Sequence, residues 1–387
     1  MILHLFSDEK FIDYTITHFK RIAPAKNTFI CIIPSSDYTL KYIKQIEDVE
    51  LMIDSKKDIS KLLAGIYQYD AVIFHSLFPR FFLKILYYVD PDKIKLVWIF
   101  FGGEFYDHPL IIQKYLGELS NNYYCFLKSN YKVIIMKMIK NIIKKSILFY
   151  DFTKFNIEKN IKKIAYISAL EEENENIQKE WHINAQCLPM GYHYFSIEKT
   201  VGDLINDHVV GTNILIGNSA NITNNHLEVF NILKDFSIGE RKIIVPLSYG
   251  GNIKYQNYIV EQGKCLWGNN FISLLSFIER EKYNQYFLDC GVVIMNHYRQ
   301  QAVGNIVTSL WLGVKLYMSE RSPVYSFLKK KNIILYTIEN DLKPDNPNVF
   351  VPLSPGEINN NRDILYKEYS FSNILNATRL IIEELSS

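Results

Sequence analysis

The chain has 387 residues, which is more than one typical hydrophobic core accommodates and suits two domains. Hydrophobic residues make up 48% and charged residues 22% of it, a composition that excludes a disordered chain and is typical of a folded globular protein. The formal net charge is only +2, so no general positive field points to nucleic acid as a partner.

Cysteine usage and apolar runs bear on the compartment. The five cysteines are widely separated, and no two of them have the spacing of metal ligands, so we interpret them as reduced thiols. The N-terminal stretch MILHLFSDEK lacks the basic region and long apolar run of a signal peptide. No apolar run reaches membrane-spanning length. We therefore expect a cytoplasmic protein.

Short apolar strands alternate with helical patterns through the first half of the chain. Strands are predicted at 2–6, 28–34, 49–53, 71–77, 96–101, 163–168 and 186–191. Helical patterns lie between them at 8–22, 58–69 and 81–89. This alternation predicts a parallel sheet that is covered by helices on both faces.

A second alternating series follows a polar segment at 196–212, which we interpret as a linker. Its strands are predicted at 213–217, 242–248, 292–296, 314–319 and 333–337, with helices at 224–236, 305–313 and 362–387. The prediction is therefore an N-terminal domain over 1–195, a C-terminal domain over 213–360 and a C-terminal helix over 361–387. Ligands of such sheets bind beyond the carboxyl ends of the strands, so chemistry is expected where strands run into loops.

The first such junction is VWIFFGGEFYDH (97–108). Two glycines end a strand there, and the acids Glu104 and Asp107 follow them. A carboxylate at a strand end is a candidate general base, with Glu104 the first choice and Asp107 the second. The alternative is that both acids are solvated residues favoured at a helix start.

A basic and apolar stretch follows at 128–152, KSNYKVIIMKMIKNIIKKSILFYDF. Lys137, Lys140 and Lys144 share one face of its helical pattern, and acids are nearly absent until Asp151. Such a helix suits an anionic membrane surface, and we expect these lysines to face the membrane. The alternative is an ordinary amphipathic helix with its lysines in solvent.

In the second half, ILIGNSANITNNH (214–226) runs from a strand into a helix. Gly217 allows a ligand to approach the backbone closely, and Asn218 and Ser219 offer short polar groups. Thr223 has an ordinary explanation as a helix N-cap. His226 falls in the first helical turn, where a single histidine is more often structural than catalytic.

A second anion-suited junction lies at NHYRQQAVGN (296–305). Arg299 has the fork geometry for phosphate, and Gln300 and Gln301 donate and accept hydrogen bonds. Gly304 and Asn305 open the following helix, whose free N–H groups attract anions. The alternative, an exposed loop that is merely polar, is weakened by the presence of two such junctions in one domain.

These segments resemble the 4-acetamido-4,6-dideoxygalactosyltransferases (N-acetylfucosaminyltransferases) of enterobacterial common antigen synthesis, glycosyltransferase family 56. The resemblance includes the Gly-Asn-Ser run with its following Asn and His, the IIVPLSYG strand (243–250) with its tyrosine, and the Arg-Gln-Gln-x-x-Gly segment. RSPVYSFL (321–328) is similar to a later family segment. The donor-binding residues that the resemblance implies are Gly217, Asn218, Ser219, Asn224, His226, Tyr249, Arg299, Gln300, Gln301, Gly304 and Asn305.

The sequence departs from the family pattern at three positions of the second half, of which Asn305 is one of the residues just named. Ala302, Asn305 and Lys315 stand where the family has Gly, Thr and Pro. In the N-terminal half, which should hold the acceptor, Gly103-Glu104 replaces a pattern closer to Ala-Asp. These departures bear on the acceptor and the donor sugar more than on the reaction class.

The resemblance implies a GT-B architecture, α/β with two Rossmann-like domains facing each other across a cleft. It also implies a dTDP-linked amino-deoxy sugar as donor and a polyprenyl-diphosphate-linked glycan as acceptor, in surface polysaccharide synthesis. The enzyme would then be peripheral on the inner face of the plasma membrane. A non-catalytic nucleotide-sugar or glycan-binding protein and a nucleotide-sugar epimerase on the same fold remain the alternatives.

The expected chemistry follows from the charge on the leaving diphosphate. No Asp-x-Asp motif follows a predicted strand, so we expect no metal ion and no cofactor. Arg299, the helix N-terminus at 304–305 and the Gly217–Ser219 loop are expected to stabilise the leaving group electrostatically. The acceptor hydroxyl needs a base only if the reaction inverts the anomeric configuration.

Overall fold

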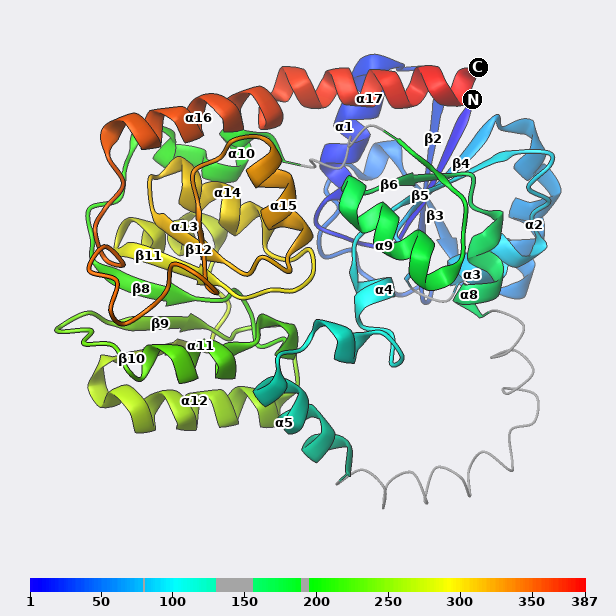
Figure 1. The fold of residues 1–387 in the computed structure, drawn as a ribbon. Coiled ribbons are helices and arrows are strands. Elements are labelled where there is room, and N and C mark those ends of the chain that lie inside the picture. The colour runs from blue at the N-terminus through cyan, green and yellow to red at the C-terminus, as the bar shows by residue number, and fades with distance from the viewer. Residues whose placement is uncertain (79–80, 130–155, 189–194) are drawn as a thin grey trace. The chain divides into compact units, whose positions relative to one another are not determined.

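The structure is a computed structural model that describes residues 1–78, 81–129, 156–188 and 195–387 (Figure 1). The chain divides into two compact units. Unit 1 contains the described residues of Met1–Asp107, Val133–Ser196 and Phe371–Ser387. Unit 2 contains the described residues of His108–Lys132 and Ile197–Ser370.

Unit 1 is built on a parallel sheet of seven strands in the order β3-β2-β1-β4-β5-β6-β7. The strands are β1 (Ile2–Phe6), β2 (Asn27–Ile33), β3 (Glu50–Ile53), β4 (Ala71–His75), β5 (Lys95–Ile99), β6 (Tyr166–Ser168) and β7 (Gln186–Cys187). Its helices are α1 (Ile12–Ile22), α2 (Lys56–Gly65), α3 (Phe81–Tyr88), α4 (Gly103–Tyr106), α8 (Ile157–Asn160), α9 (Glu171–Trp181) and α17 (Phe371–Ser386).

Unit 2 repeats this plan with six parallel strands in the order β10-β9-β8-β11-β12-β13. The strands are β8 (Asn213–Ile216), β9 (Ile243–Pro246), β10 (Phe271–Leu274), β11 (Cys290–Met295), β12 (Lys315–Met318) and β13 (Tyr336–Thr337). Its helices are α5 (Glu118–Ser129), α10 (Ile197–Val201), α11 (His226–Leu233), α12 (Ile253–Trp267), α13 (Arg280–Leu288), α14 (Val303–Trp311), α15 (Pro323–Lys330) and α16 (Pro355–Tyr369).

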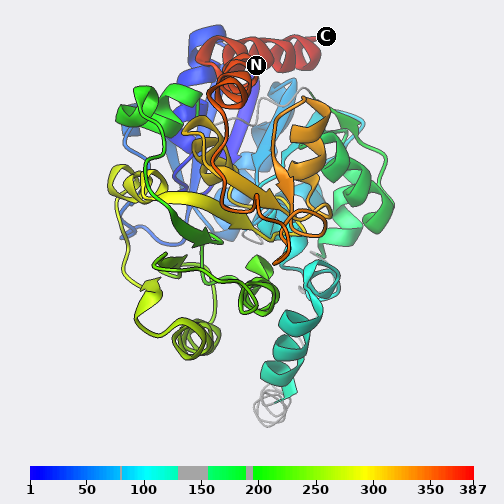
Figure 2. The same cartoon turned by 60° about the vertical axis from the view of Figure 1, so that its left-hand side comes forward.

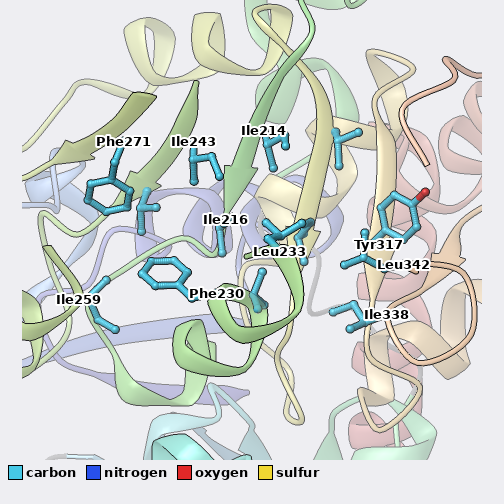
Figure 3. Close-up of a cluster of buried hydrophobic side chains, with 14 of the residues drawn as sticks. Ile214, Ile216, Phe230, Leu233, Ile243, Ile259, Phe271, Tyr317, Ile338 and Leu342 are labelled. Atoms are coloured by element: carbon cyan, nitrogen blue, oxygen red, sulfur yellow. The ribbon is translucent and has the colours of Figure 1, made fainter. Parts of the chain in front are cut away.

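Helices cover both faces of the unit 2 sheet. Helices α11 and α12 lie on one face, and α10, α13, α14 and α16 pack together on the other (Figures 1 and 2). Figure 3 shows apolar side chains of β8, β9 and β10 directed at those of α11 and α12, including Ile216, Phe230 and Ile259. In both units the core strands are mostly apolar and buried, as expected for a parallel sheet covered on two sides, with His4 in β1 and His75 in β4 among the buried polar exceptions.

The segment after α4 packs on the rest of unit 2 through polar and aromatic contacts. Glu228 in α11 accepts hydrogen bonds from the backbone N and the hydroxyl of Ser120, at 2.8 and 2.6 Å. Gly117 N donates to Asn225 Oδ1 at 2.9 Å. The rings of Tyr123 and Tyr258 stack with centroids 4.2 Å apart. Residues 108–129 therefore belong structurally to unit 2, although the sequence predicts them within the N-terminal domain.

Other element predictions differ from the structure near the domain ends. The expected linker over 196–212 contains α10 and a 3-10 helix, Gly202–Asn206, and Trp311 Nε1 donates to Ile205 O there at 2.8 Å. The expected C-terminal helix over 361–387 is two helices, because Ser370 has extended backbone angles that end α16. Helix α17 then packs on α1 in unit 1. Strand β10 was not predicted; it is a four-residue edge strand.

Candidate functional site

In unit 2 the strand order reverses between β8 and β11, which are neighbours in the sheet. In open α/β sheets this reversal opens a crevice beyond the carboxyl ends of the two strands, where ligands bind. The loops that follow β8 and β11 are Gly217–Ser219 and Asn296–Gln301. The two junctions singled out in the sequence therefore meet at the one place in unit 2 that the topology favours for a ligand.

Gly217 begins the first loop with a left-handed backbone angle, φ +67°. A Cβ atom at this position would lie 2.6 Å from Asn224 Oδ1 and 2.9 Å from His226 Nε2. Neither distance is tolerable for a real side chain, and the φ value itself disfavours one. Glycine is therefore required here by the fold, independently of any ligand.

Asn224 stabilises the conformation of this loop through side-chain hydrogen bonds. Its side chain is completely buried, and Nδ2 donates to Ser219 O at 3.0 Å. Its Oδ1 accepts from Asn218 N at 2.9 Å and from His297 Nε2 at 2.8 Å. The resemblance implied direct donor binding by Asn224, but a side chain without exposed surface supports the loop instead.

His226 and His297 are two further buried supports. Burial lowers the pKa of His226 to about 3. The pKa of His297 is also lowered to about 3, first by burial and second by the positive charge of Arg299. His226 Nδ1 lies 3.1 Å from Tyr255 Oη, and His226 has no exposed surface. Both rings are therefore neutral near pH 7, and His226 supports Gly217 rather than contacting a donor as the resemblance implied.

Gln301 clamps the two loops together. Its Nε2 donates to Asn218 Oδ1 at 2.8 Å. Its Oε1 accepts from Thr223 Oγ1 at 2.7 Å and from Arg299 Nε at 3.1 Å. The amide thus fixes the loop after β8, the start of the next helix and the arginine after β11 in one network.

Arg299 is the cation of this network. Only 8% of its surface is exposed, and the bond from its Nε to Gln301 fixes the direction of the side chain. Gln300 beside it is also buried. A guanidinium held in this way beside a helix N-terminus is suited to a phosphate or diphosphate, because its fork geometry matches two oxygens.

Helix α14 begins directly after this loop. Its N-cap, Ala302, has left-handed angles, φ 59° and ψ 27°, which turn the chain into the helix. Gly304 is exposed in the first turn, and a Cβ there would meet no atom of the described residues within 4 Å. Asn305 Nδ2 donates to Tyr283 Oη at 3.2 Å. The N-terminal turn of α14 therefore presents bare backbone at Gly304, which nothing in the fold demands.

Tyr249, in the loop after β9, completes this edge. Its hydroxyl accepts from Asn218 Nδ2 at 2.8 Å, and its backbone O accepts from Ala220 N at 2.8 Å. The side chain is nevertheless 52% exposed. A fixed aromatic face beside the Gly217–Ser219 loop has the chemistry to stack on a planar ring.

In unit 1, the predicted base Glu104 is committed to internal contacts. It is 7% exposed, and its Oε1 accepts from Trp98 Nε1 at 2.9 Å and from Phe101 N at 3.1 Å. Burial raises the pKa of its carboxyl against the lowering effect of these bonds. The contacts favour a bracing role for Glu104 at the turn after β5. Asp107 is exposed at the end of α4 and stays a candidate base.

The sequence did not single out several residues that lie in or near the loops after the strands. Thr223 was explained as an N-cap alone, yet its hydroxyl donates to Gln301. His297 lies inside the quoted stretch 296–305 and was not singled out. Glu9 follows β1 in unit 1 and was counted only as part of a helix. The sequence signal for His297 and Glu9 was their place within three residues of a strand end, whereas Thr223 lies seven residues after β8 and has no such signal.

The remaining expectations concern metals and membranes. Within residues 1–78, 81–129, 156–188 and 195–387, no three His, Cys, Asp or Glu side chains come together as metal ligands. In the same residues, no helix is both long and apolar enough to cross a membrane. The predicted membrane-facing residues Lys137, Lys140 and Lys144 lie outside the described part of the chain.

Comparison with known proteins agrees with this geometry. Residues 188–348 match the model of a family described as 4-alpha-L-fucosyltransferase, glycosyl transferase group 56. That range contains the loops after β8, β9 and β11. The family resemblance predicted from the sequence is confirmed over this range.

Solved structures with the same fold share little sequence with the chain. HepE from Anabaena, solved with UDP, has a TM-score of 0.58 at 11% identity, with 100% of this chain and 99% of that chain covered. A glycosyltransferase from Rickettsia africae gives 0.58 at 13%, covering 100% and 98%. Sucrose-phosphate synthase from Thermosynechococcus elongatus gives 0.58 at 8%, covering 100% and 99%. The predicted GT-B fold is confirmed, and the chain is a glycosyltransferase whose residues 188–348 match family 56.

Proposed function

We propose that this glycosyltransferase moves an amino-deoxy sugar from a dTDP-sugar to a polyprenyl-diphosphate-linked glycan in surface polysaccharide synthesis. The observation that carries the proposal is the network in which Gln301 joins Arg299 to Asn218 at the strand-order reversal of unit 2. This network holds a cation, amide groups and a helix N-terminus at one edge of the sheet.

The diphosphate of the donor is the group that this edge suits best. As the bond to the sugar breaks, negative charge grows on the departing diphosphate oxygen, and fixed donors stabilise it. Arg299 supplies a full positive charge, and the first turn of α14 supplies backbone N–H groups. The same groups take the place of a metal ion, so we propose transfer without a divalent cation.

Gly304 gives independent support to this assignment. Glycine in a helix costs about 0.5–1 kcal/mol relative to alanine, and a Cβ at Gly304 would meet no atom of the described chain within 4 Å. The fold therefore gains nothing from glycine here. A ligand that approaches the helix N-terminus closely, as a diphosphate does, explains it.

The nucleotide base and the sugar are the less constrained parts of the proposal. The family resemblance implies a dTDP-linked amino-deoxy sugar, and exposed Tyr249 offers a ring face to a base. HepE, similar in fold, was solved with UDP and with UDP-glucose. Both thymine and uracil derivatives therefore belong in any test.

The lipid-linked acceptor rests on the basic stretch 128–152 and on the family resemblance. Of that stretch, Lys128 and Ser129 are described, at the end of α5. In the same helix Phe126 is 58% exposed. We propose that the stretch brings the enzyme to an anionic membrane surface, where a polyprenyl-linked acceptor resides.

The deciding experiment is a donor screen. Binding of dTDP, UDP and GDP is measured by calorimetry, and release of each nucleotide from its sugar is followed with water and with polyprenyl-diphosphate glycans as acceptors. We expect the tightest binding for dTDP and the fastest release with a lipid-linked acceptor. A chain that binds none of the three nucleotides contradicts the proposal.

A further inference from the structure

Glu9 lies in the loop between β1 and α1, at the carboxyl end of the first strand of unit 1. The sheet of unit 1 reverses its strand order between β1 and β4, as that of unit 2 does between β8 and β11. The position of Glu9 in unit 1 thus corresponds to that of the Gly217–Ser219 loop in unit 2. By the same topological rule, a ligand of unit 1 is expected beside it.

The neighbouring carboxylates are fully used by the fold. Asp8 accepts hydrogen bonds from four donors, which fix the loop after β2: Lys41 N at 2.6 Å, Tyr42 N at 3.1 Å, Ile43 N at 3.1 Å and Tyr38 Oη at 3.2 Å. Glu104 accepts from Trp98 and Phe101. Both acids therefore have structural reasons to be where they are.

Glu9 differs from both. It is half-buried, and within the residues that the structure describes no hydrogen bond or ion pair reaches its carboxylate. Burial raises the pKa of Glu9; Lys10 opposes this rise, and the charges of Asp8 and Glu104 add to it. A carboxylate that is partly desolvated and repelled by its neighbours binds a proton more readily than an ordinary one.

We propose that Glu9 is the general base of the transfer reaction. As the acceptor hydroxyl oxygen forms its bond to the anomeric carbon of the donor, its proton passes to the Glu9 carboxylate. The bond from that carbon to the nucleoside diphosphate breaks, and its electron pair goes to the departing phosphate oxygen. The step is a single displacement that needs no other reactant, and the inference rests on the proposed function.

The test compares Glu9→Gln and Glu9→Asp with the parent, and Glu50→Gln, an exposed acid of β3, is the matched control. Two readouts are separate: the dissociation constant for dTDP, and the rate of dTDP release from a dTDP-sugar between pH 5 and 9. Release is measured with water and with the acceptor found in the donor screen. Melting temperatures verify that each variant folds.

We expect Glu9→Gln to bind dTDP within twofold of the parent and to release it 10²- to 10⁴-fold more slowly, the usual range for loss of a general base. The acidic limb of the pH–rate profile should disappear in Glu9→Gln and remain in Glu9→Asp and Glu50→Gln. A folded Glu9→Gln variant with the parent's rate or the parent's acidic limb overturns the proposal.

Two further outcomes are distinct. If Asp107→Asn removes the acidic limb while Glu9→Gln keeps it, the base is Asp107 and the inference about Glu9 fails. If the parent binds no nucleoside diphosphate, the proposed function itself fails. Loss of the rate in Glu9→Gln with unchanged dTDP binding supports Glu9 and leaves the donor site intact.

Discussion

Gln301 Nε2 donates a hydrogen bond to Asn218 Oδ1 at 2.8 Å, and this contact ties the loop after β11 to the loop after β8. The other end of the same amide accepts from Arg299 Nε at 3.1 Å. One side chain therefore sets both the backbone loop and the cation of the donor edge. Since an amide of this kind both donates and accepts, neither leucine nor glutamate reproduces its two bonds.

Arg299 provides the first prediction. Arg299→Ala should weaken dTDP binding and slow transfer, by several kcal/mol in combined effect, because a cation is lost where negative charge develops. Arg299→Lys should restore only part of the loss, because the fork geometry is gone. Calorimetry with dTDP and the rate of dTDP release measure the two effects. Unchanged dTDP affinity in Arg299→Ala would remove Arg299 from the donor site.

Metal independence is the second prediction. With Arg299 and the N-terminus of α14 as the proposed electrostatic partners of the diphosphate, activity should persist in EDTA. Added magnesium or manganese should change the rate by less than about twofold. Transfer that a chelator abolishes and either cation restores is the contrary result.

The buried histidines predict acid sensitivity. The pKa values of His226 and His297 in the folded chain, about 3, lie below the unfolded value of about 6.5. Unfolding below pH 6.5 therefore takes up protons, and the free energy of unfolding falls as the pH decreases toward the folded values. The slope is about 1.4 kcal/mol per pH unit for each such histidine.

Urea unfolding at pH 7.5, 6.0 and 5.0 measures this slope. His226→Gln should reduce it by roughly the contribution of one histidine, about 1.4 kcal/mol per pH unit. His208→Gln, at an exposed histidine, is the control and should leave the slope as in the parent. A free energy of unfolding that stays level from pH 6.5 to 5 would show that these histidines accept protons in the folded state.

Membrane docking is tested with vesicles. Changing Lys137, Lys140 and Lys144 to Glu should sharply reduce sedimentation with phosphatidylglycerol liposomes, since each lysine near an anionic surface contributes about 1 kcal/mol. Salt should weaken binding of the parent in the same direction. Hydrolysis of the soluble donor should survive, because the proposed donor residues lie elsewhere.

The matched control changes Lys56, Lys57 and Lys61, exposed lysines of α2, to Glu. This variant has the same net charge as the first and should still bind liposomes. If both variants lose liposome binding equally, the loss is explained by net charge and not by the position of the lysines. A parent that stays in the supernatant at low salt would end the docking hypothesis.

Much of the fold could be predicted because the buried parallel strands are short, mostly apolar runs between helical patterns. All strands were predicted except β10, a four-residue edge strand whose Ile272 is 36% exposed. The packing of residues 108–129 on unit 2 could not be predicted, because Ser120 and Glu228 are 108 residues apart and their hydrogen bond leaves no local pattern.

At the proposed donor edge, the sequence singled out two loops that hydrogen bonds join in the structure, but not the role of each residue. Position after a strand marks Asn218, Asn224 and His226 alike, and all three are buried, so only their hydrogen-bond partners distinguish their roles. Asn224 and His226 are completely buried, and Asn218 faces Gln301 and Tyr249. Only three-dimensional packing shows which polar groups of the loop are already used in hydrogen bonds within the protein.

The most direct measurement of the central claim compares Gly304→Ala with Gly356→Ala. Both glycines are exposed at the second residue of a helix, α14 and α16, and in the part of the chain that the structure describes a Cβ at either would meet no atom within 4 Å. Both changes should therefore stabilise the fold equally, by about 0.4–1 kcal/mol, through the unfolded chain. The account predicts that Gly304→Ala weakens dTDP binding at least tenfold while Gly356→Ala binds as the parent does. Equal dTDP affinity in the two variants would contradict a diphosphate site at the N-terminus of α14.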